Sequence, residues 1–439
     1  MSKAIEARLL DTIIHEAQPH VKGLVEKMES GAGAEELIEA VHELSQSCFA
    51  PVLEAVLETA REEVEQAPVC ADCGQRLRNK GVQRRGMLTP LGHVHWRRRY
   101  YYCEGCRQGH YPLDEYLGIE AGQFTARYQE GMAMLGSCLP FAQAAALFTK
   151  LTGVSVSDRE LNRTTEEHGA RLTAQRLKQQ QHWLDKGPEP KKPQPDAAWG
   201  VSLDAAKVRF RDGWHEVHVG VVFPLKDSGS GDGRAARGSP SSYVAEVGKQ
   251  AQAGEQLYAE AIRRRIDPGT ERVVCIADGA SGNWTQFAQH FGQRVEILDW
   301  YHATQHLWKA ASGVWGEGTP EADEWEKELE KVLWEGQPET VLSKLCEAAH
   351  LPGGKAAAEQ CHYFDSHGSR MAYDEYREAG YPIGSGTVES GCKQVIIARA
   401  CQAGMSWKQD RLQSVLSLRA ELISDRWDEA WSLAHPLAA

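Results

Sequence analysis

The chain has 439 residues, 42% hydrophobic and 25% charged, which is the composition of a globular protein with about two to four domains. It has no run of about 18 apolar residues and no basic segment followed by an apolar core, so we expect no membrane span, no signal peptide and a cytoplasmic location. The net charge of −12 argues against a uniformly basic, nucleic-acid-binding surface, but eight basic and no acidic side chains lie between Cys73 and Cys103.

Residues 1–67 have the pattern of two or three helices with charged outer faces. Pro19 and the Gly-Ala-Gly sequence at 31–33 are predicted to separate these helices. Such a region either packs against a second copy of the chain or another domain, or forms a solvated helical cap, and the sequence leaves both open.

Residues 68–112 alternate in polarity, most clearly at 93–103, which predicts β-hairpins. Two Cys-X-X-Cys pairs flank a spacer of 29 residues: Cys70 with Cys73, and Cys103 with Cys106. Four thiolates in two such turns are typical of a closed, structural zinc site, so we predict a zinc ribbon. Three histidines are rival ligands: His93, His95 and His110. The other seven cysteines are expected to be buried hydrophobes in a reducing compartment.

The hairpin between the cysteine pairs carries the basic stretch. Arg97, Arg98 and Arg99 follow Trp96 and precede Tyr100. Arginines can contact phosphates and base edges, and aromatic rings can stack on bases, so we predict a DNA-binding surface here. A solvated basic strand is the alternative.

Residues 113–185 are predicted to be helical, with helices near 124–137, 141–152 and 158–177. Gly153 turns the chain, and Ser157 with Glu160 forms a capping box for the last helix. This arrangement is compatible with a DNA-binding helix-turn-helix and equally with an ordinary helical hairpin. A Pro/Lys-rich linker follows at 186–198.

Residues 199–302 alternate strands and helices, and 303–376 are helical. The expected order is a strand ending at Asp204, an antiparallel return at 214–223, a Gly/Ser/Arg loop at 227–242, a strand at 243–247, a helix at 254–265, a strand ending at Asp278, a helix at 283–291 and a strand at 295–299. This is the order of a ribonuclease H-like sheet. Residues 303–376 then form a helical insertion, and 377–439 complete the core with a final helix at 407–434.

Three carboxylates mark this part of the chain. Asp204 and Asp278 each follow a β-branched run, and Glu389 lies on the first turn of a helix after a Gly/Ser break. Singly, such residues are often turn residues or favoured at helix starts by the macrodipole. Together they form a set of hard oxygen ligands suited to two Mg²⁺ ions about 3.5–4 Å apart, as in phosphodiester chemistry.

The chain resembles a bacterial insertion-sequence transposase of the ISKra type, a DDE family related to Mutator-like elements. The motifs that carry the resemblance are the two cysteine pairs, Ile-Ala-Asp-Gly-Ala at 276–280, Leu-Asp-Trp-Tyr-His at 298–302 with its continuation to 308, and Gly-Ser-Gly-Thr-Val-Glu-Ser-Gly-Cys-Lys at 384–393. The resemblance implies that Asp204, Asp278 and Glu389 are catalytic and that Asp299 and His302 are auxiliary residues of the active site.

We therefore expect a multidomain α/β protein that combines helical and zinc-ribbon DNA-binding regions with a ribonuclease H-like core. Its expected reaction is cleavage at the ends of a DNA element and strand transfer into target DNA, with two Mg²⁺ or Mn²⁺ ions per active site and a structural Zn²⁺. Expected partners are double-stranded DNA, as terminal inverted repeats and target, and a second copy of the chain. Lys393, one turn beyond Glu389, and Arg399 are candidate phosphate contacts. The alternatives are a zinc-ribbon DNA-binding regulator with an inactive nuclease fold, and a ribonuclease H-like nuclease or resolvase.

Overall fold

The computed structural model describes residues 2–64, 68–119, 122–188, 199–225 and 241–435. Most of the predicted linker at 186–198 and of the predicted loop at 227–242 lies outside these residues. The described residues form two compact units, one up to Leu135 with Phe141–Leu161, and the other made of Gly136–Pro140 with Asn162–Ala434. No described helix is both long enough and apolar enough to cross a membrane.

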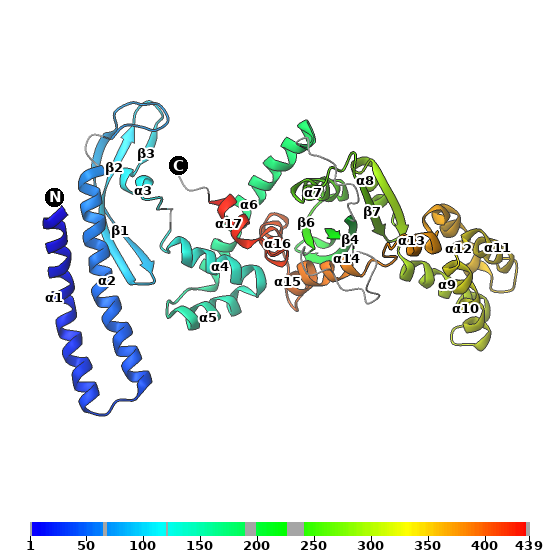
Figure 1. The fold of residues 1–439 in the computed structure, drawn as a ribbon, viewed down its shortest axis with the longest axis horizontal. Helices are drawn as coiled ribbons and strands as arrows, with labels where there is room; N and C mark the ends of the chain where they lie inside the picture. Colours follow the sequence, from blue (N-terminus) through cyan, green and yellow to red (C-terminus); the bar gives the residue numbers. More distant parts are fainter. Residues whose placement is uncertain (1, 65–67, 120–121, 189–198, 226–240, 436–439) are drawn as a thin grey trace. The chain divides into compact units, whose positions relative to one another are not determined.

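The first unit begins with two long helices that pack against each other, α1 (Ser2–Glu29) and α2 (Ala34–Val64) (Figure 1). The turn between them uses Gly31 at φ +80°, a conformation that favours glycine. Pro19 lies inside α1, so the prediction that it separates helices is wrong. A proline removes one backbone donor and bends a helix, but packing along α2 can offset that local cost.

A three-stranded antiparallel sheet follows, in the order β1 (Arg78–Thr89), β2 (Gly92–Cys103) and β3 (Gln108–His110). Alternation along β2 places Val94 and Trp96 on one face. These two side chains form a small core with Ala50 and Leu57 of α2 and with Leu113 of α3 (Pro112–Tyr116). The predicted β-hairpins are therefore confirmed.

The predicted helices after the sheet are also confirmed: α4 (Ala126–Cys138), α5 (Phe141–Thr152) and α6 (Asp158–Lys186). Gly153 turns the chain at φ +71°, and the N–H of Glu160 donates to Ser157 Oγ over 3.1 Å, as a cap requires. Helix α6 continues well past the expected end near residue 177.

The second unit contains a five-stranded mixed sheet in the order β6-β5-β4-β7-β8. Strands β4, β5 and β6 pair antiparallel, and β4, β7 and β8 pair parallel. The elements in chain order are β4 (Trp199–Phe210), β5 (Gly213–Pro224), β6 (Ser242–Glu246), α7 (Gln250–Arg263), β7 (Arg272–Ala277), α8 (Ser281–His290) and β8 (Gln293–Leu298).

Two layers of helices cover the sheet. Leu257 of α7 lies next to Gly220 and Leu203, so α7 covers the face to which those residues point, and α8 packs against α7. The opposite face, marked by Val219, is covered by α14 (Gly386–Gly391), because Gly391 lies against Val219. A π-helical turn, η2 (Cys392–Ile397), and α15 (Ala398–Ala400) continue from α14, and α16 (Gln409–Ile423) packs on η2 and β6.

A block of helices lies between β8 and α14, as predicted for 303–376: α9 (Trp300–Trp315), α10 (Pro320–Trp334), α11 (Pro338–Ala348), α12 (Lys355–His367), the 3₁₀ turn η1 (Gly368–Arg370) and α13 (Tyr373–Glu378). The expected single C-terminal helix is instead two, α16 and α17 (Trp427–Ala434), because Asp425 adopts φ +56° and ends the first. The predicted mixed α/β architecture is thus confirmed at the level of N-terminal helices, a small antiparallel sheet and a five-stranded mixed sheet.

Candidate functional site: a four-cysteine cluster and a carboxylate cluster

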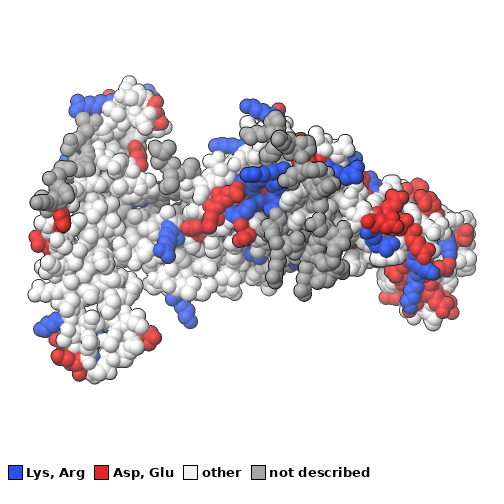
Figure 2. Space-filling view, viewed as in Figure 1, with Lys and Arg blue, Asp and Glu red and all other residues white. Residues whose placement is uncertain are grey.

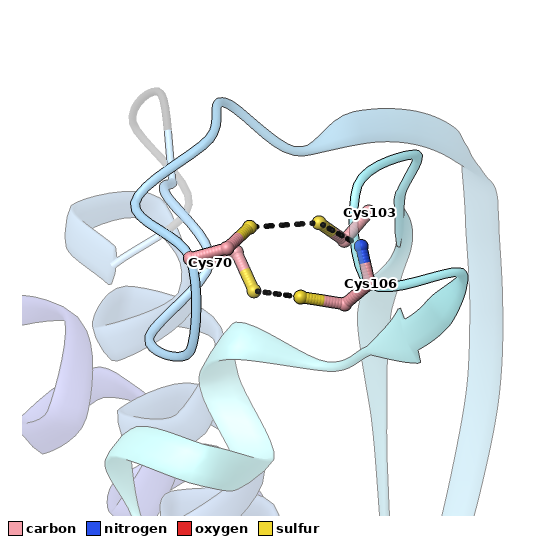
Figure 3. Close-up of side chains that lie close together, drawn as sticks. Cys70, Cys103 and Cys106 are labelled. Carbon is pink, nitrogen blue, oxygen red and sulfur yellow. Dashed lines mark hydrogen bonds between the residues drawn. The ribbon is translucent and has the colours of Figure 1, made fainter.

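The first candidate site is the cysteine cluster of the small sheet. The sulfurs of Cys70, Cys73, Cys103 and Cys106 all lie within 4.8 Å of one another and could hold a metal such as zinc. Figure 3 shows Cys70 facing Cys103 and Cys106 across the end of the sheet. The Cys70–Cys106 sulfurs are 3.8 Å apart and the Cys73–Cys103 sulfurs 3.4 Å. Tetrahedral ligation at about 2.3 Å requires sulfurs about 3.8 Å apart, so the spacing fits zinc.

Local turns position these thiols. Gly74 adopts φ +71° and donates its N–H to the carbonyl of Cys70, which closes the first turn. In the second turn, the N–H of Cys106 donates to Cys103 Sγ over 3.4 Å. That bond is the largest influence on the pKa of Cys103, which is lowered to about 7, while the neighbouring thiol of Cys73 and burial raise the pKa of Cys106. His110 Nε2 lies 3.7 Å from Cys70 Sγ, beside the four thiols.

The second candidate site begins where β4 and β7 run parallel. Their last registered pair is Ser202 with Ile276, and Asp204 and Asp278 each lie two residues further on. Side chains alternate along strands, so both aspartates are at equivalent positions at the same end of the parallel pair. The prediction that Asp204 ends a strand is wrong, because β4 continues to Phe210 in antiparallel pairing with β5.

Glu389 reaches the same place from α14. It lies on the first turn of that helix, as predicted, and is half-buried. One turn later, the buried thiol of Cys392 donates to Asp204 Oδ2 over 3.2 Å. The other oxygen of Asp204 accepts the N–H of Ala205 at 2.7 Å. The thiol therefore ties the glutamate-bearing segment to the first aspartate.

Asn283 and nearby backbone groups hold the second aspartate. Asp278 Oδ1 accepts from the Asn283 side chain at 2.9 Å and from the N–H of Ala280 at 3.1 Å. The same Asn283 amide donates to the carbonyl of Leu203, the residue before Asp204, at 3.3 Å. One buried side chain of α8 thus bridges the two strands that carry the aspartates.

Ser385 links the glutamate to Asp299. Its hydroxyl donates to Glu389 Oε1 over 3.2 Å, and its N–H donates to Asp299 Oδ2. Asp299 is fully buried and caps α9 by accepting from the N–H of His302 at 2.7 Å and from its Nδ1 at 2.8 Å. The pair predicted to be auxiliary therefore adjoins the carboxylate cluster through a single serine.

The electrostatics reflect this proximity. The hydrogen bond to Asp299 raises the pKa of His302 against the opposing effect of burial, and the charges of Asp299, Asp278 and Glu389 raise it further. Burial alone would raise the pKa of Asp299, but hydrogen bonds from His302 and Ser385 outweigh it and hold the pKa below its usual range. The charges of Asp299, Asp278 and Glu389 therefore all act on His302.

The carboxylate cluster lacks compensating cations. Within the described part of the chain, no lysine or arginine forms an ion pair with Asp204, Asp278 or Glu389. The oxygens of the three do not all lie within 4.8 Å of one another, so they form an open set rather than a closed cage. Buried Glu421, by contrast, pairs with Arg176, Arg263 and Arg426.

Three residues predicted to contact DNA are buried or nearly buried within the protein. Trp96 is only 3% exposed and packs in the core against α2, so the prediction that it stacks on bases is wrong. Arg98 is nearly covered, pairs with Asp114 and lies over the ring of Tyr111 at 3.6 Å. Arg399 is fully buried and donates to the carbonyl of Gly136 at 2.9 Å, which makes it a structural residue.

The remaining predicted contacts differ in exposure. Arg97 is exposed and pairs with Glu58 at 3.2 Å, while Arg99 is partly buried. Lys393 is exposed and follows Cys392 in sequence, but the π-helical turn that begins at Cys392 alters the face expected from regular α-helical spacing.

Sequence reasoning missed Asn283, Ser385, Cys392 and Tyr363 near the carboxylates. Ser385 and Cys392 lie inside the motif at 384–393, so their proximity to Glu389 could have singled them out. Nothing local distinguishes Asn283 or Tyr363, whose roles depend on packing between distant segments.

Comparison with known proteins gives one family. Residues 27–187 match the model of the Uncharacterised protein family (UPF0236). The matched residues include the four cysteines and the helices from α2 to α6 but none of the three carboxylates. A comparison with curated proteins finds no match.

Proposed function

We propose that this chain is a DDE transposase of an insertion sequence, with Asp204, Asp278 and Glu389 as its catalytic carboxylates. The observation that carries the proposal is that Asp204 and Asp278 each lie two residues beyond the last registered pair of the parallel strands β4 and β7, with the Glu389 segment joined to Asp204 by the Cys392–Asp204 hydrogen bond. The sheet order β6-β5-β4-β7-β8 supports a ribonuclease H-like core, because this order and its strand directions match that fold.

The charge at the carboxylate cluster favours a divalent cation. Three carboxylates gather where the described residues provide neutral donors and one histidine but no ion-pairing lysine or arginine, so their negative charge calls for a cation. Asp204, Asp278 and Glu389 would hold Mg²⁺ or Mn²⁺, which would polarise the phosphodiester and activate the attacking oxygen. Asn283, Cys392 and Ser385 would keep the carboxylate orientations fixed.

The reaction proceeds in two displacements at phosphorus. Water first opens a phosphodiester at the element end and leaves a 3′ hydroxyl and a 5′ phosphate. That 3′ hydroxyl then attacks a phosphodiester of the target, forms the new strand junction and releases a target 3′ hydroxyl. The protein contributes mainly positioning, since phosphodiester transfer depends on alignment and charge stabilisation.

DNA binding is proposed for the outer face of the small sheet. Arg84 of β1 lies opposite Arg97 of β2 in the strand register, and both side chains are exposed on the same face of the sheet. In contrast, Figure 2 shows acidic and basic side chains intermixed over the helices α9–α12, and α10 alone carries six acidic residues against two lysines. The four cysteines, with zinc bound, would hold this basic hairpin in shape.

A second copy of the chain is the proposed partner of the N-terminal helices. Five apolar side chains of α1 are exposed, and at about 100° per residue they fall within about 60° of one another. They are Leu10, Ile14, Val21, Val25 and Met28. Helix α2 exposes a similar set: Ile38, Val41, Phe49 and Val56. Stripes at such spacing are typical of helix-bundle interfaces, and a two-fold partner would present identical stripes.

This part of the proposal is tested by the mass of the protein in solution. Sedimentation of wild type should give a dimer, and Ile14→Glu with Val21→Glu should give a folded monomer. Glu6→Gln, on the same helix, is the control and should remain dimeric. A monomeric wild type would contradict self-association through these stripes.

Strand joining tests the central proposal. The protein is incubated with a labelled duplex that carries the DNA flanking its gene, a target plasmid, and Mg²⁺, Mn²⁺ or EDTA. We expect cleavage that leaves 3′ hydroxyl ends and joined products that require the metal. Metal-dependent cleavage without joining would favour a nuclease, and binding without cleavage would favour a DNA-binding regulator.

A further inference from the structure

Helix α12 of the helical block brings one aromatic ring to the carboxylate cluster. Tyr363 lies against the loop that follows β7, where Gly279 comes directly after Asp278. A Cβ at Gly279 would collide with the Tyr363 ring, so the ring can lie there only because residue 279 is a glycine. His306 of α9 stacks on the ring, with centroids 3.6 Å apart and planes 14° apart.

The neighbours of Tyr363 hold this arrangement in place. His306 Nδ1 lies 2.5 Å from Gln360 Oε1, one helical turn before Tyr363. Burial lowers the pKa of His306, which favours a neutral ring for stacking. His367, one turn after Tyr363, packs edge-on against the Tyr363 ring, with centroids 4.9 Å apart. Side chains from α9 and from two turns of α12 thus hold the Tyr363 ring in place.

The hydroxyl of Tyr363 is the unexplained group in this arrangement. It is buried, and among the described residues it has no hydrogen-bond partner. Burial, Asp278 and Asp299 all raise the pKa of Tyr363, so the phenol keeps its proton and can donate. A buried donor without an acceptor is unfavourable and calls for an explanation, of which a bound ligand is one.

We propose that the Tyr363 hydroxyl donates a hydrogen bond to a non-bridging phosphate oxygen of the nucleic acid bound at the carboxylate cluster. This inference rests on the proposed function and adds to it a substrate contact from the helical block. A neutral donor suits this position because a lysine or arginine there would compete with a cation for the three carboxylates. The carboxylates themselves do not take the proton, because no described carboxylate oxygen lies within hydrogen-bond distance of the hydroxyl.

The proposal explains why the block between β8 and α14 stands beside the site. Without Tyr363 the block would serve only to cover β8, where Tyr373 donates to the carbonyl of Leu298 at 3.1 Å and Tyr376 to that of Glu296 at 3.2 Å. Those two hydroxyls are satisfied within the protein. The hydroxyl of Tyr363 is the one aimed at the loop of Asp278.

The test compares Tyr363→Phe with Tyr373→Phe in the full-length protein. Both substitutions remove one buried phenolic oxygen and keep the ring. Three quantities are measured: the melting temperature without DNA or divalent cation, the Kd for a flanking-DNA duplex in EDTA, and the rate of metal-dependent cleavage. The first two do not depend on catalysis.

Tyr363→Phe should leave the melting temperature unchanged or raise it by about 1–3 °C, because it removes an unpaired buried donor. It should weaken duplex binding and slow cleavage by about 10- to 100-fold in total, as loss of a hydrogen bond to a charged oxygen predicts. Tyr373→Phe should lower the melting temperature and leave binding and cleavage by the folded protein unchanged.

Two results would overturn the proposal. Wild-type Kd and cleavage in Tyr363→Phe would mean that the hydroxyl contacts no substrate and bonds only to water. A melting temperature lowered as in Tyr373→Phe would mean that the hydroxyl is paired within the protein. Failure of the proposed function is separate, because it appears in the wild type as absent cleavage; if the wild type also fails to bind DNA, both proposals fall together.

Discussion

The four-cysteine cluster and the carboxylate cluster are built on opposite principles. Each cysteine pair lies in one tight turn, so Cys70 with Cys73 and Cys103 with Cys106 are close before any tertiary structure forms. The carboxylates Asp204, Asp278 and Glu389 come from a strand, the loop after a neighbouring strand and a helix, and they come together only after the sheet has acquired its register and α14 has packed on it. One site is local in sequence and the other is a product of the whole unit.

The two clusters should therefore depend differently on their ligands. The core around the cysteines is small and consists of Cys70, Leu77, Tyr101 and Cys103 with Cys106 beside them, so the metal would have to supply much of its stability. The carboxylates stand on a larger sheet, in which β7 is buried after its first residue and about half of β4 and β5 is buried. Substitution of a cysteine should unfold the four-cysteine cluster, whereas substitution of a carboxylate should leave the sheet folded but inactive.

The largest effect is expected at the carboxylates. Asp204→Asn keeps the size of the side chain and an acceptor for Cys392, but it removes the charge needed by a cation. Cleavage should fall by about 1,000-fold or more, while the melting temperature stays near that of wild type. Cleavage rates and thermal unfolding are measured together.

Asp212→Asn is the matched control, because Asp212 lies in the exposed turn between β4 and β5 and pairs with His215 at 3.1 Å. It should retain full activity. Cleavage by Asp204→Asn within tenfold of wild type would remove Asp204 from the catalytic set.

At the cysteine cluster the expected loss is structural. Cys103→Ser should reduce bound zinc from about one per chain to near zero and expose residues 68–110 to proteolysis, because closed thiolate sites fold with their metal. Metal analysis and limited proteolysis followed by mass spectrometry measure the two effects. The five-stranded sheet should remain resistant.

Cys346→Ser is the control for thiol removal, since Cys346 is exposed on α11, away from the small sheet in sequence. Zinc content should not change in this variant. Well-folded wild-type protein without bound metal would contradict the zinc assignment altogether.

The same contrast explains what the sequence could predict. Cysteine spacing identified the thiol cluster, and polarity patterns located most strands and helices, because both signals are local. The position of Asp204 inside β4 was missed because strand length depends on pairing with β5, which continues beyond the parallel partner. The burial of Trp96 and Arg399 was missed because it depends on packing against distant helices and turns. Asn283, Ser385 and Tyr363 hold or approach the site only through such long-range contacts.

A second carboxylate environment sharpens the comparison, because buried Glu421 is paired with three arginines. Burial alone would raise the pKa of Glu421, but Arg263, Arg426 and Arg176 outweigh it and lower the pKa to about 2. A carboxylate with a depressed pKa stabilises the folded state above its unfolded pKa, and that stability is lost as the pH falls towards the folded pKa. The window is therefore about pH 4.5 down to about pH 2, with a contribution of at most about 3 kcal/mol.

Urea denaturation between pH 2 and 6 measures this contribution. Glu421→Gln should lower the free energy of unfolding at pH 6 and flatten its decline below pH 4.5. Glu104→Gln is the control, because Glu104 is exposed and its pair with Arg78 lies in solvent. If the free energy of unfolding depends on pH in Glu421→Gln as it does in wild type, the three arginines do not lower the pKa of Glu421 enough to affect stability.

The smallest effect is expected on the basic hairpin, where two adjacent arginines should behave differently. Arg97 is 67% exposed and pairs only weakly with Glu58, so it is free to exchange that partner for a phosphate. Arg98 is 15% exposed, pairs with Asp114 and stacks on Tyr111.

Arg97→Ala should weaken duplex binding by a few fold and reduce the log–log salt slope by about 0.9, the loss of one phosphate contact. Arg98→Ala should instead destabilise the small sheet by about 1–2 kcal/mol and leave the salt slope of the folded protein unchanged. Binding isotherms from 50 to 300 mM salt, with thermal unfolding of each variant, separate the two outcomes. Equal salt slopes for wild type and Arg97→Ala would move the DNA-binding surface from the hairpin to the helices α5 and α6, since their turn and cap match the predicted helix-turn-helix.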